Sequence, residues 1–203
     1  HSGALPQAIN VIKPERVYAS QVGVDTLKRH FHWDVTVTPV KDGETVSIGN
    51  MTLTFLDTKM LHWPESNASY LAERKVLFSQ DIFGMHLASS HRYAYEENPE
   101  VLRFEATKYY ANIVMPYSPI VARLLKKVAG LNLPFEIIAP DHGPIWRKDI
   151  NTIIEWYAKW ADQKPTDKVV IVYDTMWKST ELMARVIADG AIQGGSPVKV
   201  MCM

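Results

Sequence analysis

Three side chains that can bind a metal ion follow strand-like segments of this sequence. His62 lies in MLHWPES, Asp81 in LFSQDIFG and His142 in IIAPDHGPIW, each directly after an apolar run. Rigid strands aim the side chains that follow them, and the loops leave room for a substrate. A carboxylate among imidazoles suits iron, manganese or zinc, and a carboxylate can bridge two ions. The pattern indicates a metal site; the alternative is three unrelated loop residues, each satisfied by hydrogen bonds.

The other internal histidines give weaker patterns. His30 and His32 stand in RHFHWD, which begins like an H-x-H-x-D metal motif, but the histidine that would continue it is missing. The segment lies where a helix gives way to a strand, and a histidine suits the dipole of a helix C-terminus. We therefore expect these two residues to lie outside the metal site. His86 and His91 lie in a polar loop without a pattern, although His86 is close to Asp81 along the chain.

A second polar segment can hold a phosphate. YDTMWKST, residues 173–180, lies between an apolar strand and a helix and carries hydroxyls at Thr175, Ser179 and Thr180. Hydroxyls and backbone N–H groups at a helix N-terminus form an anion site. In a flavodoxin-like sheet, the loop after the first strand is where the FMN phosphate lies. The segment lacks the glycine patterns of dinucleotide and nucleoside-triphosphate loops. The alternative is an ordinary helix start capped by Ser179 or Thr180.

The elements that position these residues form two blocks. In the first block, period-2 alternation predicts strands, and apolar residues at three- and four-residue steps predict helices. The predicted strands are 16–20, 35–40, 44–48, 51–56, 69–71, 75–78 and 135–139, and the predicted helices are 6–12, 24–31, two within 99–130 that are separated at Pro116 and Pro119, and 149–161.

The second block follows a polar linker, QKPTD, at 163–167. A continuous apolar run at 169–173 is typical of a parallel strand that is buried on both faces. A helix from about 180 to 190 and another apolar run at 198–203 come next. This order is the βαβ opening of a doubly wound domain, which we expect to begin near Lys168.

Composition and charge narrow the possible functions. The 203 residues contain 22 basic and 22 acidic side chains, so there is no electrostatic case for nucleic acid binding. No apolar run approaches the roughly 20 residues of a membrane span. The single cysteine, Cys202, excludes an internal disulfide and suits a reducing cytoplasm. Because the chain starts at His1 and ends on an apolar segment, we expect it to be a piece cut at both ends.

These motifs, in this order, resemble those of the flavodiiron proteins, which join a metallo-β-lactamase-like diiron domain to a flavodoxin-like domain. The steps of 19 residues from His62 to Asp81 and of 61 from Asp81 to His142 are similar to the family's own. The resemblance implies an α/β fold: an αββα sandwich, incomplete at its N-terminus, over 1–162, and the start of an FMN-binding flavodoxin-like domain over 168–203. The matching stretches cover nearly the whole chain and are HSGALP, MLHWPES, LFSQDIFG, YYANIVMPYS, APDHGPIWR and YDTMWKST.

The resemblance also implies roles for the metal-binding residues. His62 and His142 would each bind one of two iron ions, and Asp81 would bridge both. His1 looks like the final histidine of the family motif H-x-E-x-D-H-S-G, which is a ligand in some members. The other ligands of that motif would precede His1.

Further roles concern the substrate pocket and the flavin. Tyr109 and Tyr110 fall where the family places a tyrosine near the pocket, and the sequence does not decide between them. The loops that hold the flavin ring would lie beyond Met203. The segment that resembles the FMN phosphate loop consists of Thr175, Met176, Trp177, Lys178, Ser179 and Thr180.

The implied function is reductive. The family reduces dioxygen to water or nitric oxide to nitrous oxide, with electrons that reach FMN from a rubredoxin-like or other donor. Its subunits pair head to tail, so we expect a cytoplasmic homodimer or dimer of dimers, and no activity from residues 1–203 alone. One alternative is a metal-dependent hydrolase of the same fold, although hydrolysis needs no electron carrier. The other is a non-catalytic flavin electron carrier, although the metal-binding residues argue against it.

Overall fold

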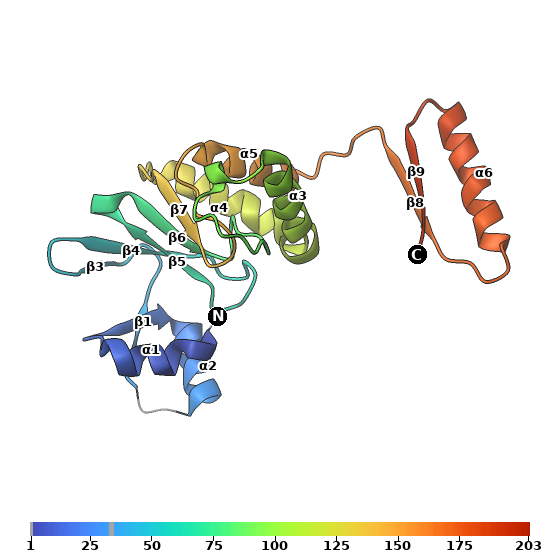
Figure 1. The fold of residues 1–203 in the computed structure, drawn as a ribbon. Coiled ribbons are helices and arrows are strands. Elements are labelled where there is room, and N and C mark those ends of the chain that lie inside the picture. Colours follow the sequence, from blue (N-terminus) through green and yellow to red (C-terminus); the bar gives the residue numbers. More distant parts are fainter. Residues whose placement is uncertain (1, 33–34) are drawn as a thin grey trace. The chain divides into compact units, whose positions relative to one another are not determined.

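A computed structural model describes residues 2–32 and 35–203 (Figure 1). The chain divides into two compact units, residues 1–162 and residues 163–203. Within the described residues, no helix is long and apolar enough to cross a membrane.

A five-stranded sheet organises the first unit. Its strand order is β3-β4-β5-β6-β7, with antiparallel pairs up to β6 and a parallel pair between β6 and β7. The predicted strands are confirmed. They form because alternating apolar residues direct one face of each strand to the core. The strands are β3 Thr45–Ser47, β4 Thr52–Asp57, β5 Asn67–Leu71, β6 Val76–Gln80 and β7 Ile137–Pro140.

The strand directions bring three chain segments to one edge of this sheet. β5 is antiparallel to both β4 and β6, so β4 and β6 run in the same direction. β7 runs parallel to β6. The C-terminal ends of β4, β6 and β7 therefore lie at one edge, which we call the site edge.

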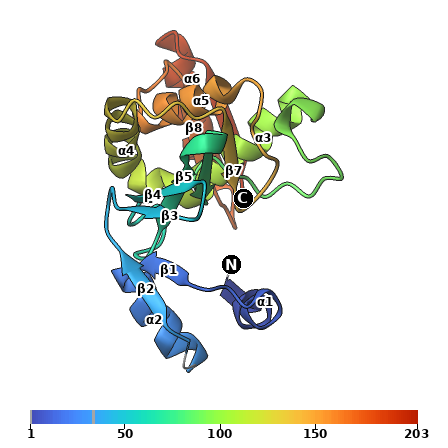
Figure 2. The same cartoon turned by 90° about the vertical axis from the view of Figure 1, so that its left-hand side faces the viewer.

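Three helices cover one face of the sheet (Figures 1 and 2). They are α3 Pro99–Tyr109, α4 Ser118–Gly130 and α5 Ile150–Ala161. Pro119 lies in the first turn of α4, where its missing N–H costs nothing. Between α3 and α4 the chain forms a π-helical turn, Tyr110–Val114, and a 3-10 turn, Met115–Tyr117. Fully buried residues of this core include Leu56, Met85, Ala106, Val121, Ile138, Ile153 and Tyr157.

The N-terminal elements pack beside the loop that follows β4. β1 pairs in parallel with β2. The Ser20 hydroxyl accepts a hydrogen bond from the Gly23 N–H, which caps α2, and donates to the carbonyl of Glu65 at 2.8 Å. This contact ties α2 to the loop that carries His62. The elements are α1 Leu5–Ile12, β1 Val17–Ser20, α2 Gln21–Phe31 and β2 Val37–Val40.

The second unit is one βαβ element. β8 Val169–Tyr173 and β9 Val198–Cys202 pair in parallel, and α6 Ser179–Gln193 packs against both strands. Within the described residues β8 alternates rather than being buried on both faces, because α6 covers one side and Val170 and Val172 are 53% and 54% exposed on the other. The expectation of a strand buried on both faces is therefore not met within residues 163–203.

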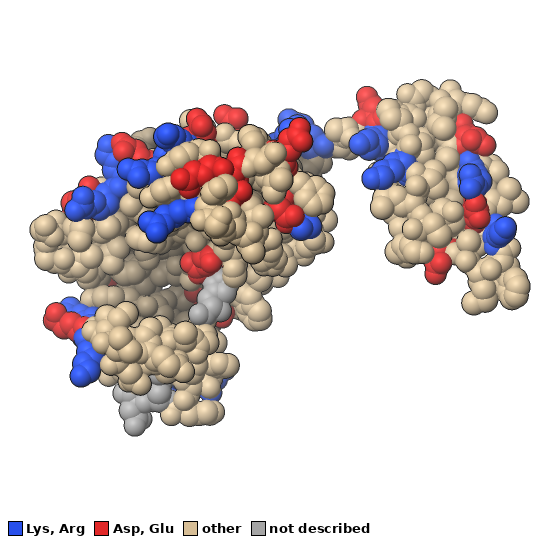
Figure 3. All heavy atoms as spheres, in the orientation of Figure 1, with Lys and Arg blue, Asp and Glu red and all other residues tan. Residues whose placement is uncertain are grey.

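Charged side chains of both signs are interspersed over the face of each unit that Figure 3 shows. Several are paired, such as Lys75 with Glu136 at 2.6 Å. These pairs are exposed, so each contributes little to stability. Nothing on this face concentrates one sign of charge.

Candidate metal centre

Three loops at the site edge carry the predicted metal-binding residues. His62 lies in the loop 58–66 after β4, Asp81 directly after β6, and His142 in the loop after β7. The last two loops are held together by their backbones. The Asp141 N–H donates to the Gln80 carbonyl at 2.9 Å, and the Met85 N–H donates to the His142 carbonyl at 3.2 Å.

Two glycines allow this close approach of the loops. A Cβ on Gly84 would lie 2.9 Å from the carbonyl oxygen of His142 and 3.1 Å from that of Asp81. Gly143 has φ +80, and a Cβ there would lie 2.8 Å from Cγ of Met85. A side chain at either position would push the loop of His142 away from the loop of Asp81.

We expect Gly84→Ala to disturb the site at its backbone. The new methyl group collides with a carbonyl oxygen, so the variant should lose about 1–3 kcal/mol of stability and bind less metal per chain. Gly130→Ala, at the end of α4, is the control, because nothing lies within 4 Å of a Cβ built there. Thermal unfolding and elemental analysis check both variants. Normal metal content in Gly84→Ala would contradict the role of this contact.

The side chains converge on Asp81. Nε2 of His62 lies 3.5 Å from Oδ2 of Asp81, and Nε2 of His142 lies 3.4 Å from Oδ1. Metal–ligand bonds of about 2.1 Å at angles of about 90–110° separate neighbouring ligand atoms by about 3.0–3.4 Å. The two observed distances lie at and just above the upper end of this range, and they are longer than most direct hydrogen bonds.

Each imidazole faces a different oxygen of the one carboxylate. A carboxylate that is approached on both oxygens in this way can contact two different ions. Among the described residues no three or more His, Cys, Asp and Glu side chains are grouped so as to hold one ion by themselves. His1, the further ligand that the resemblance implies, lies outside the described residues.

Burial and neighbouring charges act in opposite directions on Asp81. Its side chain is 8% exposed, and this burial raises the pKa of the carboxyl above its ordinary value. His62, His142 and a hydrogen bond from Tyr109 partly offset that rise. A buried carboxylate that needs positive charge around it is suited to cations.

Of the two candidate pocket tyrosines, Tyr109 reaches the site. Its hydroxyl bonds to Asp81, and its ring centroid lies 6.5 Å from that of His142. Burial and the charge of Asp81 raise the pKa of Tyr109, so the hydroxyl stays protonated. Tyr110 instead points into the core, where its hydroxyl lies 2.9 Å from that of Ser118 and its ring packs against Tyr157. Consecutive helical residues point about 100° apart, which separates the two rings.

His86 lies closer to the site than its sequence context predicts. Its ring lies edge-on to His142, with centroids 5.3 Å apart, and to Tyr109 at 4.9 Å. The nearness of His86 to Asp81 along the chain was the signal that the sequence offered. His86 is exposed, so it lies between the site and solvent.

The rejected histidines lie at a helix end, as predicted. His30 is in the last turn of α2 beside Lys28 and Arg29, and His32 is the C-cap residue. Asp34, which completes the H-x-H-x-D pattern, lies outside the described residues. His91 pairs with Glu97 at 3.3 Å.

The predicted phosphate segment leads from the end of β8 into the first turn of α6. The helix begins at Ser179, and its N-cap is Lys178, in a left-handed conformation with no side-chain capping bond. The alternative, a cap by Ser179 or Thr180, is therefore wrong. The Thr175 N–H donates to the Asp174 carboxylate at 2.8 Å. The donors left for an anion are the three hydroxyls and the first N–H groups of α6. Met176 and Trp177 beside them are more than 80% exposed.

The mixed sheet, its helical layer and the histidine–carboxylate cluster at one edge define a metallo-β-lactamase-like domain. Residues 2–143 match the family model described as ODP family beta lactamase, and the chain belongs to that family. This confirms the predicted fold class.

The chain is similar over almost its whole length to proteins with redox names. It is 44% identical to a nitric oxide reductase of Moorella thermoacetica, covering 98% of this chain and 50% of the relative. The solved rubredoxin oxygen:oxidoreductase of Desulfovibrio gigas is 44% identical with a TM-score of 0.94, covering 100% of this chain and 51% of that one. A flavodiiron protein of Giardia intestinalis is 31% identical with a TM-score of 0.82, covering 91% and 46%.

These relatives confirm the resemblance to flavodiiron proteins, and their names are those of oxidoreductases. The chain spans about half the length of the curated relatives it matches.

Proposed function

We propose that the full-length protein is a flavodiiron oxidoreductase that reduces dioxygen to water, nitric oxide to nitrous oxide, or both. The observation that carries the proposal is the placement of the Asp81 carboxylate between Nε2 of His62 and Nε2 of His142. When bound, two iron ions would supply electrons to the gas and FMN would replace them. The names of the relatives support this chemistry over hydrolysis.

The residues of this chain have distinct roles in the proposal. His62 and His142 would each hold one of the two ions, and Asp81 would be shared between them. The Tyr109 hydroxyl remains a hydrogen-bond donor at Asp81 and orients that carboxylate. Phe83 and Met85, both at most 5% exposed, exclude water from the protein side of the loop.

The start of α6 would hold the FMN phosphate through Thr175, Ser179 and Thr180, with Met176, Trp177 and Lys178 completing the loop. We further propose a rubredoxin-like or other electron donor, which the name of the Desulfovibrio relative supports. The head-to-tail homodimer or dimer of dimers belongs to the same proposal. A cytoplasmic location is also part of the proposal, and it suits the single exposed cysteine, Cys202.

Anaerobic stopped-flow spectroscopy on the full-length protein tests the function. Reduced, iron-loaded protein should be reoxidised by dioxygen or nitric oxide much faster than the same protein prepared without iron. Equal rates with and without iron would overturn the proposal, since a flavin electron carrier needs no metal for slow reoxidation. Metal-dependent hydrolysis without gas consumption would favour the hydrolase alternative.

A further inference from the structure

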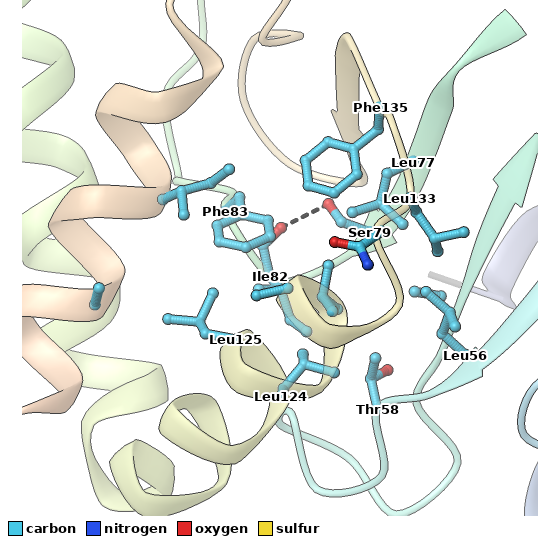
Figure 4. Close-up of a pocket in the computed structure, with 16 residues that line it drawn as sticks. Leu56, Thr58, Leu77, Ser79, Ile82, Phe83, Leu124, Leu125, Leu133 and Phe135 are labelled. Atoms are coloured by element: carbon cyan, nitrogen blue, oxygen red, sulfur yellow. Dashed lines mark hydrogen bonds between the residues drawn. The ribbon is translucent and has the colours of Figure 1, made fainter.

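An apolar cavity of about 310 Å³ lies between the sheet and helices α4 and α5 (Figure 4). Of the 16 described residues that line it, 13 are apolar and none is charged. One of the three polar ones, Ser79, donates its hydroxyl to the carbonyl of Ile82 at 2.7 Å. A cavity with so few available polar partners does not hold ordered water well.

One end of the cavity is exposed, and the other end is lined by the residues that directly follow Asp81 in the chain. At one end, Ala129 and Asn132 of the α4 end and Ala158 of α5 are exposed. At the other end the lining residues Ile82 and Phe83 are 3% and 5% exposed, and they directly follow Asp81. The Phe83 ring packs on Tyr157 with centroids 4.8 Å apart, so Phe83 belongs both to the cavity lining and to the packed core beside it.

The volume and the apolar lining of the cavity indicate which ligands can bind in it. Engineered apolar cavities of about 150 Å³ stay dry and bind xenon or benzene. This cavity has about twice that volume, so it has room for several diatomic molecules. Dioxygen and nitric oxide are small and apolar, and they gain from leaving water for such a lining.

We propose that this cavity is a binding site for apolar diatomic gas beside Asp81, through which the substrate reaches the metal centre. The inference rests on the proposed function for the identity of the gas. Binding there raises the local gas concentration next to the site. Core side chains change rotamer from time to time, and such a change at Phe83 admits the gas to Asp81.

The test uses variants of the full-length protein that fill the outer end of the cavity. Ala129→Trp blocks it from α4, and Ala158→Trp blocks it from α5 if the first variant folds poorly. Lys126→Trp places the same side chain at an exposed position of α4 that does not line the cavity. Melting temperature and iron content verify that each variant folds and is loaded.

Xenon binding and steady-state kinetics test whether the cavity binds the gas. Xenon NMR on the metal-free protein should show xenon bound in the parent and in Lys126→Trp, and lost in the filled variants. Steady-state kinetics should show a several-fold higher KM for the gas in the filled variants, with kcat unchanged, because binding before the chemical step is what they lose.

The outcomes separate this inference from the proposed function. Absence of xenon from the parent cavity, or an unchanged KM in both filled variants of an active enzyme, overturns the inference alone. A parent that binds xenon but consumes neither gas overturns the proposed function and the gas role together.

Discussion

Replacing Asp81 by asparagine should remove both iron ions from the full-length protein and abolish gas reduction. The neutral amide cannot link two cations, and the site loses the carboxylate that both imidazoles face. Loss of an outer partner of a ligand already costs roughly 10- to 100-fold in metal affinity, so loss of the shared ligand should cost more. Iron per chain by elemental analysis and gas consumption by electrode measure the effect.

Variants of the two histidines test whether Asp81 is shared by two ions. If Asp81 bridges two ions, His62→Ala and His142→Ala should each keep about one ion per chain, while Asp81→Asn keeps neither. Asp149→Asn and His30→Ala are matched controls, because Asp149 is an exposed N-cap residue and His30 lies in the last turn of α2. An Asp81→Asn protein that retains one tightly bound ion would refute the bridging role.

The second large effect concerns the flavin. The double variant Thr175→Ala, Ser179→Ala should weaken FMN binding to the full-length protein by roughly 100-fold or more, since each hydrogen bond to a charged group contributes about 1.5–3 kcal/mol. The reason is that Ser179 begins α6 and Thr175 lies in the loop that leads into it, where the helix N-terminus favours an anion. Flavin fluorescence titration of the FMN-free protein measures the dissociation constant.

Riboflavin, which lacks the phosphate, provides the internal control. Its affinity should be the same in the parent and in the double variant, because the lost hydroxyls face only the phosphate. Ser196→Ala, at the far end of α6, should bind FMN as the parent does. Unchanged FMN affinity would show that this loop is not the phosphate site, and an equal loss for both flavins would show that the variant disturbs the fold instead.

Local patterns in the sequence predicted the elements and the positions of the three central side chains. His62, Asp81 and His142 each follow a strand, and a strand end is visible from period-2 alternation followed by turn residues. Their convergence depends on strand direction and order, which no local pattern records. The resemblance to a family supplied that step, and the parallel pairing of β6 with β7 explains it.

The features that the sequence left undecided depend on backbone detail. Tyr109 and Tyr110 are separated by the rotation of about 100° between consecutive helical residues, and apolar periodicity does not reveal which of the two faces the site. His86 approaches His142 because the loops are joined by a backbone hydrogen bond and a glycine contact. Lys178 replaces a serine or threonine as the N-cap of α6 through a left-handed backbone conformation that its residue type does not favour.

The strand directions also divide the loops of the sheet into two groups. The turns at 48–51 and 72–75 join their strands at the edge opposite the site edge. The first of these turns contains Gly49, which has φ +83 and open space around it. Insertions at such exposed turns are generally tolerated. This far edge therefore offers an anchoring point for a dye or an electrode tether, which would leave the three ligand-bearing loops facing freely into solution.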